Sequence, residues 1–206
     1  MKYIDDLKTK YNIPDYLYEK VIDSYKILEK TYENNGKILV CGNGGGASDS
    51  EHIVGELMKS FIKKRELNND FKSTAISKGF SELNDNLQGT LCAISLVSQI
   101  GVISAFANDN NPDYVYAQQV YGYGNKGDTL IALTTSGNSK NIINAAKCAI
   151  VKGMNVISIT NENGGKIASY SDVNVNINQL DTYKVQELTL PIYHAWCLEL
   201  EEHFFK

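Results

Sequence analysis

The chain has 206 residues, of which 43% are hydrophobic and 21% are charged, a composition typical of one globular domain with a buried core. Its formal net charge of −4 disfavours a nucleic-acid surface that depends on bulk positive charge. No apolar run approaches the roughly 20 residues of a membrane-spanning helix, and the polar residues 1–10 are unlike a signal peptide. The four cysteines have no short spacing, which argues against a disulfide scaffold and a cysteine zinc site. We therefore expect a soluble, cytoplasmic protein without a membrane or nucleic-acid partner.

The first part of the chain follows a helix–strand–helix order. After Pro14, apolar residues recur at spacings of three and four, which predicts a helix that ends near Gly36. Residues 37–41 form a short apolar strand that runs directly into the glycine-rich residues 42–46. An apolar periodic segment over residues 47–62 then predicts a second helix.

The same order returns in the second half of the chain. Apolar runs typical of strands covered on both faces alternate with helical periodicity. The predicted strands are residues 91–96, 128–133, 155–159 and 173–177, and the predicted helices are residues 141–152 and 182–205. Strands and helices that alternate through short turns predict an α/β fold, a five-stranded parallel sheet with helices on both faces.

Residues 63–90 do not fit this order. The segment is polar, rich in Asn, Ser and Lys, and has no sustained period, so it is expected to be an inserted loop with at most one helical turn. Two roles stay open for it, a mobile surface excursion or a lid over a site. No repeat or linker divides the chain, so residues 1–206 are expected to form a single domain.

A loop rich in hydroxyl groups follows the predicted strand 128–133. Residues 134–139 read Thr-Thr-Ser-Gly-Asn-Ser and directly precede a predicted helix. Ligands of open α/β sheets bind at the carboxyl ends of strands, and the N–H groups of a helix N-terminus bind anions. Hydroxyl groups add neutral donors there, so the loop predicts a site for a phosphate monoester. The alternative is an ordinary turn in which Ser139 caps the helix.

Histidine is scarce, with three in the whole chain. His52 and Glu56 are four residues apart and share one face of the predicted helix. Such a pair can hold a metal ion, exchange protons, or make a plain surface contact. His194 lies among apolar residues, so it is expected to be partly buried, either as a ligand or as a satisfied core residue.

Four motifs in order resemble those of the bacterial phosphoheptose isomerases, which belong to the sugar isomerase (SIS) domain superfamily. The motifs are Cys41-Gly-Asn-Gly-Gly-Gly-Ala-Ser-Asp-Ser-Glu-His52-x-x-x-Glu56, Ala107-Asn108-Asp109, Thr134-Thr-Ser-Gly-Asn-Ser139 and Asp181-Thr-Tyr-Lys-Val-Gln186-Glu, with His194 eight residues after Gln186. The resemblance extends from about residue 15 to the C-terminus and is interrupted by residues 63–90.

The resemblance implies a flavodoxin-like SIS domain, assembled as a homotetramer with active sites at subunit interfaces. It implies conversion of sedoheptulose 7-phosphate to D-glycero-D-manno-heptose 7-phosphate, towards the heptose of bacterial lipopolysaccharide or capsule, with one zinc ion per subunit. The implied zinc ligands are His52, Glu56, Gln186 and His194. The implied sugar contacts are Asn43, Gly44, Gly45, Glu56, Asn108, Asp109 and Gln186, and the implied phosphate contacts are Thr134, Thr135, Ser136 and Ser139.

Ketose–aldose isomerisation moves a proton between C1 and C2 through an enediol or enediolate. Glu56 is the expected base, His194 its acid–base partner, and zinc would polarise the carbonyl group. Gln186 and His194 point about 80° apart on an ideal helix, because eight residues do not complete whole turns. Pro191 lies between them and is expected to kink or loosen this helix.

The chain departs from the family pattern mainly at the sugar end. Leu96-Val-Ser-Gln99 stands where the family reads Leu-Thr-Thr-Asp, so an acidic group is expected to be missing there. Lys184 takes the place of a usual arginine. Two alternatives therefore stay open: an isomerase of another phosphosugar, and a non-catalytic SIS module that binds a phosphosugar or a protein partner.

Overall fold

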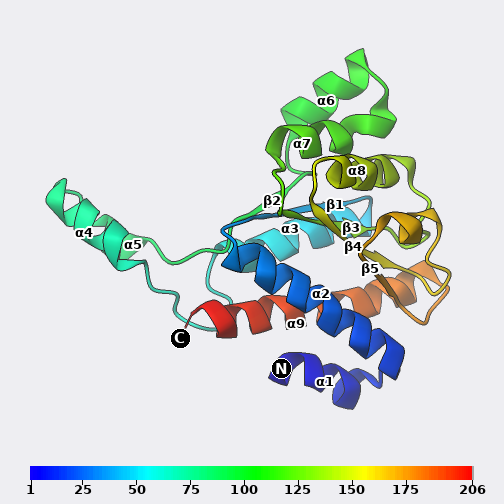
Figure 1. Cartoon of the computed structure of the whole chain (residues 1–206), viewed down its shortest axis with the longest axis horizontal. Helices are drawn as coiled ribbons and strands as arrows, with labels where there is room; N and C mark the ends of the chain where they lie inside the picture. The colour runs from blue at the N-terminus through cyan, green and yellow to red at the C-terminus, as the bar shows by residue number, and fades with distance from the viewer. Residues whose placement is uncertain (206) are drawn as a thin grey trace.

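A five-stranded, all-parallel sheet forms the centre of the protein, in a computed structural model that describes residues 1–205 (Figure 1). The predicted domain, residues 1–206, is thus described except for its last residue. The strands are β1 (Ile38–Gly42), β2 (Ala93–Ser95), β3 (Thr129–Leu133), β4 (Asn155–Thr160) and β5 (Val173–Asn176). Their order across the sheet is β2-β1-β3-β4-β5. The predicted fold class and all five predicted strands are confirmed.

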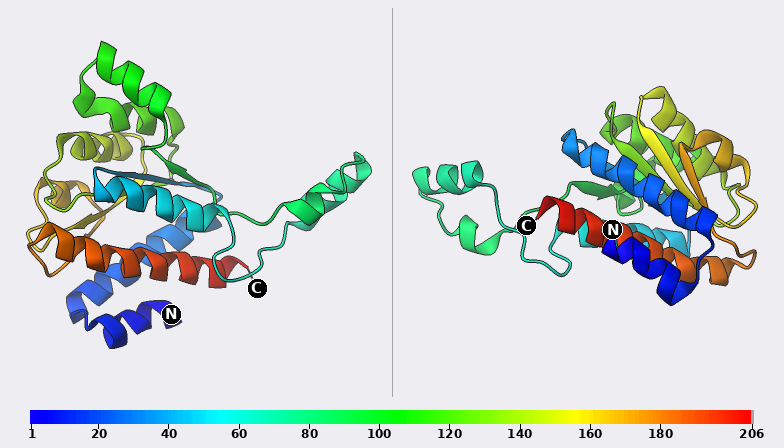
Figure 2. Two further views of the ribbon diagram at one scale, coloured as in Figure 1. Left: turned by 180° about the vertical axis from the view of Figure 1, so that it is seen from behind. Right: turned by 60° about the horizontal axis from the view of Figure 1, so that its bottom comes forward.

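Helices cover both faces of the sheet (Figure 2). The helices are α1 (Lys2–Tyr11), α2 (Asp15–Glu33), α3 (Gly45–Met58), α4 (Asn69–Ser77), α5 (Leu83–Asn86), α6 (Ile100–Asp109), α7 (Val115–Tyr123), α8 (Lys140–Val151) and α9 (Thr182–Phe204), with the short 3-10 helices η1 (Pro112–Tyr114) and η2 (Lys166–Tyr170). Within residues 1–205, no helix is both long and apolar enough to cross a membrane.

The alternation of β1 shows how the two layers form. Ile38 and Val40 point into a core with α1, α2, α3 and α9, whereas Leu39 and Cys41 point into the opposite core with α7 and α8. Every residue of β1 is buried, as expected of a central parallel strand covered on both faces. The sheet therefore has two apolar cores, and its carboxyl edge is left for polar loops.

The segment 63–90, expected as a loop with at most one helical turn, contains two helices. The Asn68 side chain accepts a hydrogen bond from the N–H of Phe71 at 2.7 Å and so caps α4. Apolar residues of the segment, among them Ile76 and Phe80, are exposed and bury little surface, which is why its sequence shows no clear period. This segment, here called the arm, projects away from the sheet (Figures 1 and 2).

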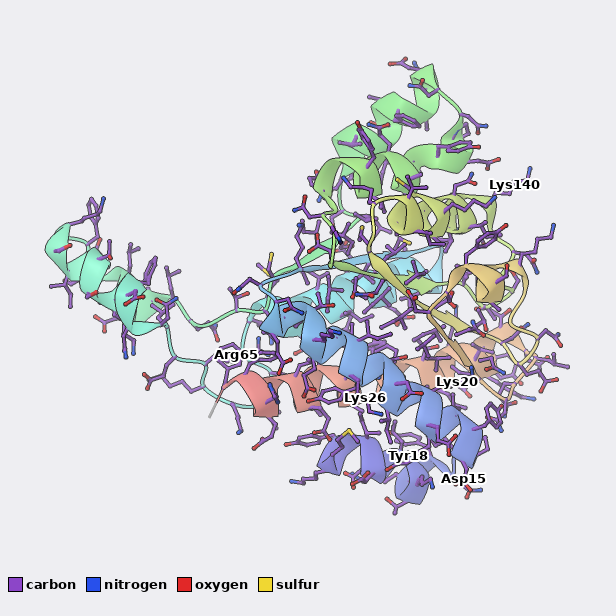
Figure 3. All side chains as sticks on the ribbon, in the orientation of Figure 1. Asp15, Tyr18, Lys20, Lys26, Arg65 and Lys140 are labelled. Carbon is purple, nitrogen blue, oxygen red and sulfur yellow. The ribbon has the colours of Figure 1, made fainter. Side chains whose placement is uncertain are left out.

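A buried ion pair holds the base of the arm. Arg65, labelled in Figure 3, donates from Nε to Glu201 Oε1 of α9 at 2.7 Å, and both side chains are at most 1% exposed. The Arg65 guanidinium also donates to the carbonyl groups of Leu57 at 2.6 Å and Glu56 at 2.8 Å, which end α3. Glu201 further accepts hydrogen bonds from the backbone N–H groups of residues 61–63. One pair therefore ties α3, the arm and α9 together.

The ionisation of Glu201 reflects these bonds. Burial by itself would raise the pKa of Glu201, but the three backbone N–H groups and the Arg65 guanidinium hold it below its ordinary value. A carboxyl group whose pKa is lower in the folded state stabilises the fold at pH values above its unfolded-state pKa. This stabilisation is lost as the pH falls through the folded-state pKa. The contribution of Glu201 therefore falls away in acid.

We predict that Glu201→Leu lowers the free energy of unfolding by about 3–5 kcal/mol, because it leaves the buried Arg65 charge unpaired. Urea denaturation measures this change. Glu202→Leu is the matched control, since its carboxylate is 53% exposed beside Lys63 and should cost less than about 1 kcal/mol. Equal losses in the two variants would contradict the role given to Glu201.

Candidate active site

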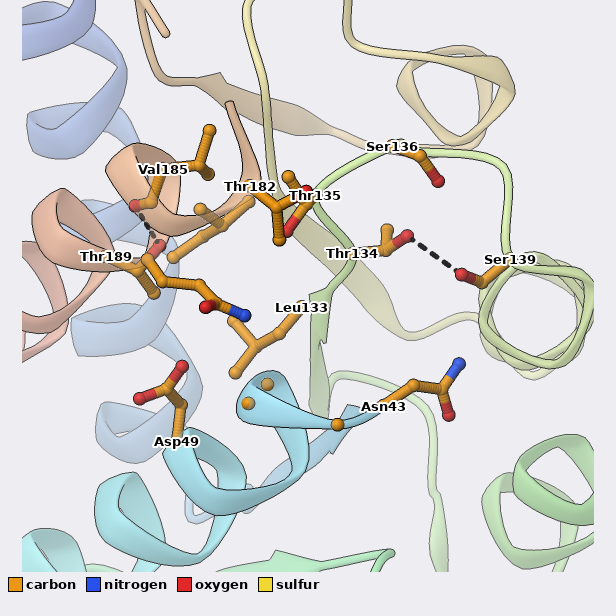
Figure 4. A pocket seen from close by; sticks show the side chains of 15 residues that line it. Asn43, Asp49, Leu133, Thr134, Thr135, Ser136, Ser139, Thr182, Val185 and Thr189 are labelled. Carbon is orange, nitrogen blue, oxygen red and sulfur yellow. Dashed lines mark hydrogen bonds between the residues drawn. The ribbon is translucent and has the colours of Figure 1, made fainter. Parts of the chain in front are cut away.

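A cavity of about 440 Å³ opens at the carboxyl ends of β1 and β3, between the N-terminal ends of α3, α8 and α9 (Figure 4). Its lining residues are Asn43, Gly44, Gly45, Gly46, Asp49, Leu133, Thr134, Thr135, Ser136, Ser139, Ile159, Thr182, Val185, Gln186 and Thr189. No lysine, arginine or histidine is among them, and Asp49 is the one ionisable group. The arm contributes no lining residue, so in this structure it is not a lid over the cavity.

The hydroxyl loop, residues 134–139, forms one wall of this cavity. Ser139 occupies the N-cap position of α8 but makes no capping hydrogen bond; its Oγ instead lies 3.3 Å from Thr134 Oγ1, which donates to it. Gly137 has φ +66°, and a Cβ there would collide with the Gly164 carbonyl oxygen. The backbone can therefore turn this tightly only with glycine, and the turn leaves the N-terminus of α8 facing the cavity.

The glycine loop, residues 42–46, forms the opposite wall. Gly44 has φ +57°, and a Cβ on Gly45 would lie 2.5 Å from Gln186 Nε2. Asn43 exchanges two hydrogen bonds with Asn141 of α8, at 2.9 and 3.0 Å, which ties the two walls together. The glycines thus let the Gln186 amide approach the backbone at the start of α3.

A second group of side chains lies further along α3 and α9. This histidine cluster consists of His52, Glu56 and His194. His52 Nε2 is 3.4 Å from Glu56 Oε1, and the ring centroids of His52 and His194 are 5.0 Å apart in an edge-on arrangement. The predicted proximity of the three residues is therefore found, because α3 and α9 pack against each other on one face of the sheet although they are far apart in the sequence. Asp49 joins the cluster to the cavity, since it lines the cavity and accepts from Tyr193 beside His52.

Burial shapes the proton affinities of this region. Burial lowers the pKa of His194, and the neighbouring His52 lowers it further, while Glu56 has the opposite effect. Burial also raises the pKa of the Asp49 carboxyl group, against the opposing effects of Tyr193 and His52. At neutral pH the His194 imidazole is therefore neutral and able to take up a proton.

The cluster has two buried atoms without a hydrogen-bond partner, Glu56 Oε2 and His194 Nε2. The Lys59 ammonium group lies 3.5 Å from Glu56 Oε2 but donates no hydrogen bond to it. Across residues 1–205, no group of three or more His, Cys, Asp or Glu side chains is arranged to hold a metal ion. The unpartnered oxygen and nitrogen nevertheless are donor atoms that zinc prefers, so these residues fit a cation.

Gln186 does not lie with the other implied zinc ligands. Its amide faces Gly45 inside the cavity, and His194 is about 12 Å further along α9, from the rise of 1.5 Å per residue. Pro191, expected to kink or loosen the helix, lies inside α9, which continues without a break from Thr182 to Phe204. The structure thus brings Gln186 to the cavity rather than to the histidine cluster.

The structure also separates Asn108 and Asp109 from the cavity. Both are exposed at the C-terminal end of α6, where Asn108 Nδ2 donates to Asp109 Oδ1 at 2.8 Å, and neither lines the cavity. Helix α6 was not predicted. Most of its residues are apolar and none is fully buried, so the helical spacing of the partly buried Ile103, Phe106 and Ala107 does not stand out in the sequence. The implied sugar contacts at these two positions are therefore not formed within this subunit.

Sequence reasoning missed Asp49, Thr182, Thr189 and Tyr193 as residues of this region. Asp49 had a signal, because it stands three residues before His52 and so shares its helix face. Thr182 and Thr189 precede and follow Gln186 at helical spacing, so they line the same side of α9. Tyr193 had no such signal, because an aromatic residue in an apolar helical segment is ordinarily a core residue.

A carboxylate from another element lies near the departure at residues 96–99. Glu51 of α3 accepts hydrogen bonds from Ser95 at 3.1 Å and from Ser98, both at the carboxyl end of β2. Gln99 itself stands at the N-cap of α6. The sequence departure at this strand end is thus accompanied by a carboxylate from another element.

Comparisons with known proteins agree with this geometry. The SIS domain family matches residues 94–196. The phosphoheptose isomerase of Helicobacter pylori strain P12 is 37% identical over 91% of this chain and 86% of its own length. That of Neisseria gonorrhoeae strain NCCP11945 is 31% identical over 95% and 89%. The solved structure of phosphoheptose isomerase GmhA from Neisseria gonorrhoeae superposes with a TM-score of 0.76 at 30% identity, covering 96% of this chain and 94% of that one.

The hydroxyl loop generates a prediction about anion binding. Thr135→Val replaces a hydroxyl group of the cavity wall with a methyl group of similar size. The variant should bind inorganic phosphate roughly tenfold or more weakly, because one hydrogen bond to a charged group contributes about 1.5–3 kcal/mol. Isothermal titration calorimetry measures the affinity. Thr9→Val in the exposed part of α1 is the control. Equal phosphate affinity in the two variants would show that Thr135 does not bind the anion.

Proposed function

Because the chain belongs to the phosphoheptose isomerase family of SIS-domain proteins, we propose that it converts sedoheptulose 7-phosphate to D-glycero-D-manno-heptose 7-phosphate. The observation that carries this proposal is the meeting of two kinds of group at one place. An anion-binding loop at the N-terminus of α8 shares a cavity with Asp49 and Gln186, and this cavity adjoins the histidine cluster. One part can hold a phosphate group while the other moves protons.

The phosphate end of the substrate would be held without a basic side chain. Thr134, Thr135, Ser136 and Ser139 supply hydroxyl groups, and the first turn of α8 supplies N–H groups and the positive end of its dipole. Binding energy from this remote group orients the reacting carbons rather than changing their chemistry. Asn43, Gly44, Gly45 and Gln186 would contact the sugar chain between the two ends.

Proton transfer is assigned to the histidine cluster. Glu56, whose side chain is 12% exposed, would remove the proton from C1 and return it to C2 through the enediol or enediolate. His194, neutral at physiological pH, would exchange the proton between the two substrate oxygens through the ring nitrogen that does not hold the metal ion. The partial burial of both groups restricts competing proton exchange with water.

We assign zinc, one ion per subunit, to His52, Glu56 and His194 on the strength of the unpartnered Glu56 Oε2 and His194 Nε2. Gln186 is the fourth ligand implied by the family, and here it would have to turn from Gly45 towards the cluster. When bound, the ion would polarise the substrate carbonyl group. The protein residues would retain the proton transfers described above.

A homotetramer, with sites at subunit interfaces, is the proposed assembly. Helix α6 carries the sequence Ile-Gly-Val-Ile-Ser-Ala-Phe-Ala, yet none of its residues is buried and Ile100 is 77% exposed. An apolar helix of this kind is expected to be covered by another surface. A neighbouring subunit on α6 would also bring protein close to Asn108 and Asp109. We place the enzyme in the cytoplasm, upstream of the heptose of bacterial surface polysaccharides.

We predict turnover of sedoheptulose 7-phosphate by the purified protein, lost on zinc removal by a chelator and restored by zinc. Glu56→Gln should abolish turnover while phosphosugar binding stays within a few-fold of the wild type, because the phosphate site is separate. The assays are product identification by NMR and calorimetric titration. Glu19→Gln, at an exposed carboxylate of α2, is the control and should keep wild-type turnover. Turnover of a different phosphosugar alone would favour an isomerase of another substrate, whereas binding without any turnover would favour a non-catalytic module.

We predict that light scattering gives the mass of a tetramer, and that Ile100→Asp reduces this mass and the turnover. A charge at this position would have to be desolvated in the interface. Val151→Asp is the control, because Val151 is 87% exposed as the last residue of α8. A monomeric wild type that turns over substrate would contradict the proposed assembly.

A further inference from the structure

A chain of hydrogen bonds connects the cavity with His52 through a tyrosine. Tyr193, next to His194 on α9, is 1% exposed, and its hydroxyl group lies 2.9 Å from His52 Nδ1. The same hydroxyl group donates to Asp49 Oδ1 at 3.2 Å. Asp49 and His52 are three residues apart on α3, so one turn of this helix presents both groups to the Tyr193 oxygen.

The direction of these bonds follows from counting protons. A phenol group has one proton, and an ionised carboxylate can only accept. Tyr193 is the one hydrogen-bond donor to the Asp49 side chain among the described residues, so its proton is required there. The Tyr193 oxygen must then accept from His52, which places the imidazole proton on Nδ1.

This arrangement determines what the other side of the imidazole can do. With its proton on Nδ1, neutral His52 presents a lone pair at Nε2, 3.4 Å from Glu56 Oε1. Both atoms are then acceptors and have no proton to share. A cation between them would satisfy both, and the nearby His194 Nε2 and Glu56 Oε2 have no hydrogen-bond partner either. The opposite tautomer would place a proton in that space.

We propose that Asp49 and Tyr193 are positioning residues that hold the proton of His52 on Nδ1 and so keep Nε2 free as a metal ligand. The inference rests on the proposed function, because zinc is the metal assigned there. Replacing a residue that hydrogen-bonds to the non-ligating ring nitrogen of a histidine ligand typically changes metal affinity by about 10–100-fold. Asp49 and Tyr193 therefore belong to the metal-binding machinery without contacting the metal.

The tautomer is tested directly on the metal-free protein. Nitrogen-15 NMR of protein labelled at histidine should show His52 protonated at Nδ1 near pH 8, and its signals among the three histidines are assigned with a His52→Gln variant. In Asp49→Asn, the new amide group can donate to the Tyr193 oxygen, so the phenol proton turns to His52 and the imidazole proton moves to Nε2. A wild-type proton on Nε2, or a tautomer unchanged by Asp49→Asn, would overturn the proposal.

Metal affinity gives the second test, by competition of zinc with a chromophoric chelator. Tyr193→Phe keeps the ring and should weaken zinc binding about 10–100-fold. The matched control is Tyr32→Phe, which removes a hydroxyl group that donates to the Cys92 carbonyl at 3.2 Å and should leave zinc affinity unchanged. Equal zinc affinity in Tyr193→Phe and wild type would overturn the proposal. Absence of zinc binding by the wild type would instead refute the assigned metal, and the NMR result would still decide the roles of Asp49 and Tyr193.

Discussion

The packing of α3 against α9 places every reactive group of this protein. The two helices meet at three levels: Gly45 against Gln186 at the cavity, His52 against Tyr193 and His194 in the middle, and the end of α3 against the Arg65–Glu201 pair. A small slip between the helices would break all three levels at once, because each depends on close contact. The fully buried ion pair at one end and the glycine at the other therefore define the register that the chemistry requires.

The cavity combines neutral hydrogen-bond donors with the absence of a positive side chain. Its walls offer hydroxyl groups and the N-terminus of α8, and the one ionisable lining residue is the Asp49 carboxyl group. Neutral donors bind a phosphate group without the long, flexible side chains of lysine or arginine, so they leave room for the sugar beside them. The histidine cluster lies apart from this wall, on α3 and α9.

Two parts of the chain bury little of their apolar surface within one subunit. Helix α6 has no buried residue, and the arm leaves Ile76 and Phe80 exposed although both segments are helical. The arm stands away from the cavity, at the end of α9 where Arg65 and Glu201 hold its base (Figures 1 and 3). These segments are the places where a neighbouring surface would add stability, whereas the sheet and its two cores are complete without one.

The sequence alone determined the sheet, the hydroxyl loop and the pairing of His52 with Glu56, because each has a local pattern: continuous apolar runs, hydroxyl residues at a strand end, and a His-x-x-x-Glu spacing. It did not reveal α6 or the helices of the arm, since these helices have few buried residues to mark one face as apolar. Nor could it separate Gln186 from His194 or join Tyr193 to His52, because the partners of side chains on α9 depend on how that helix lies against α3. The sequence sets which residue types are present. The distances between their side chains depend on how α3 packs against α9, two helices that are far apart in the sequence.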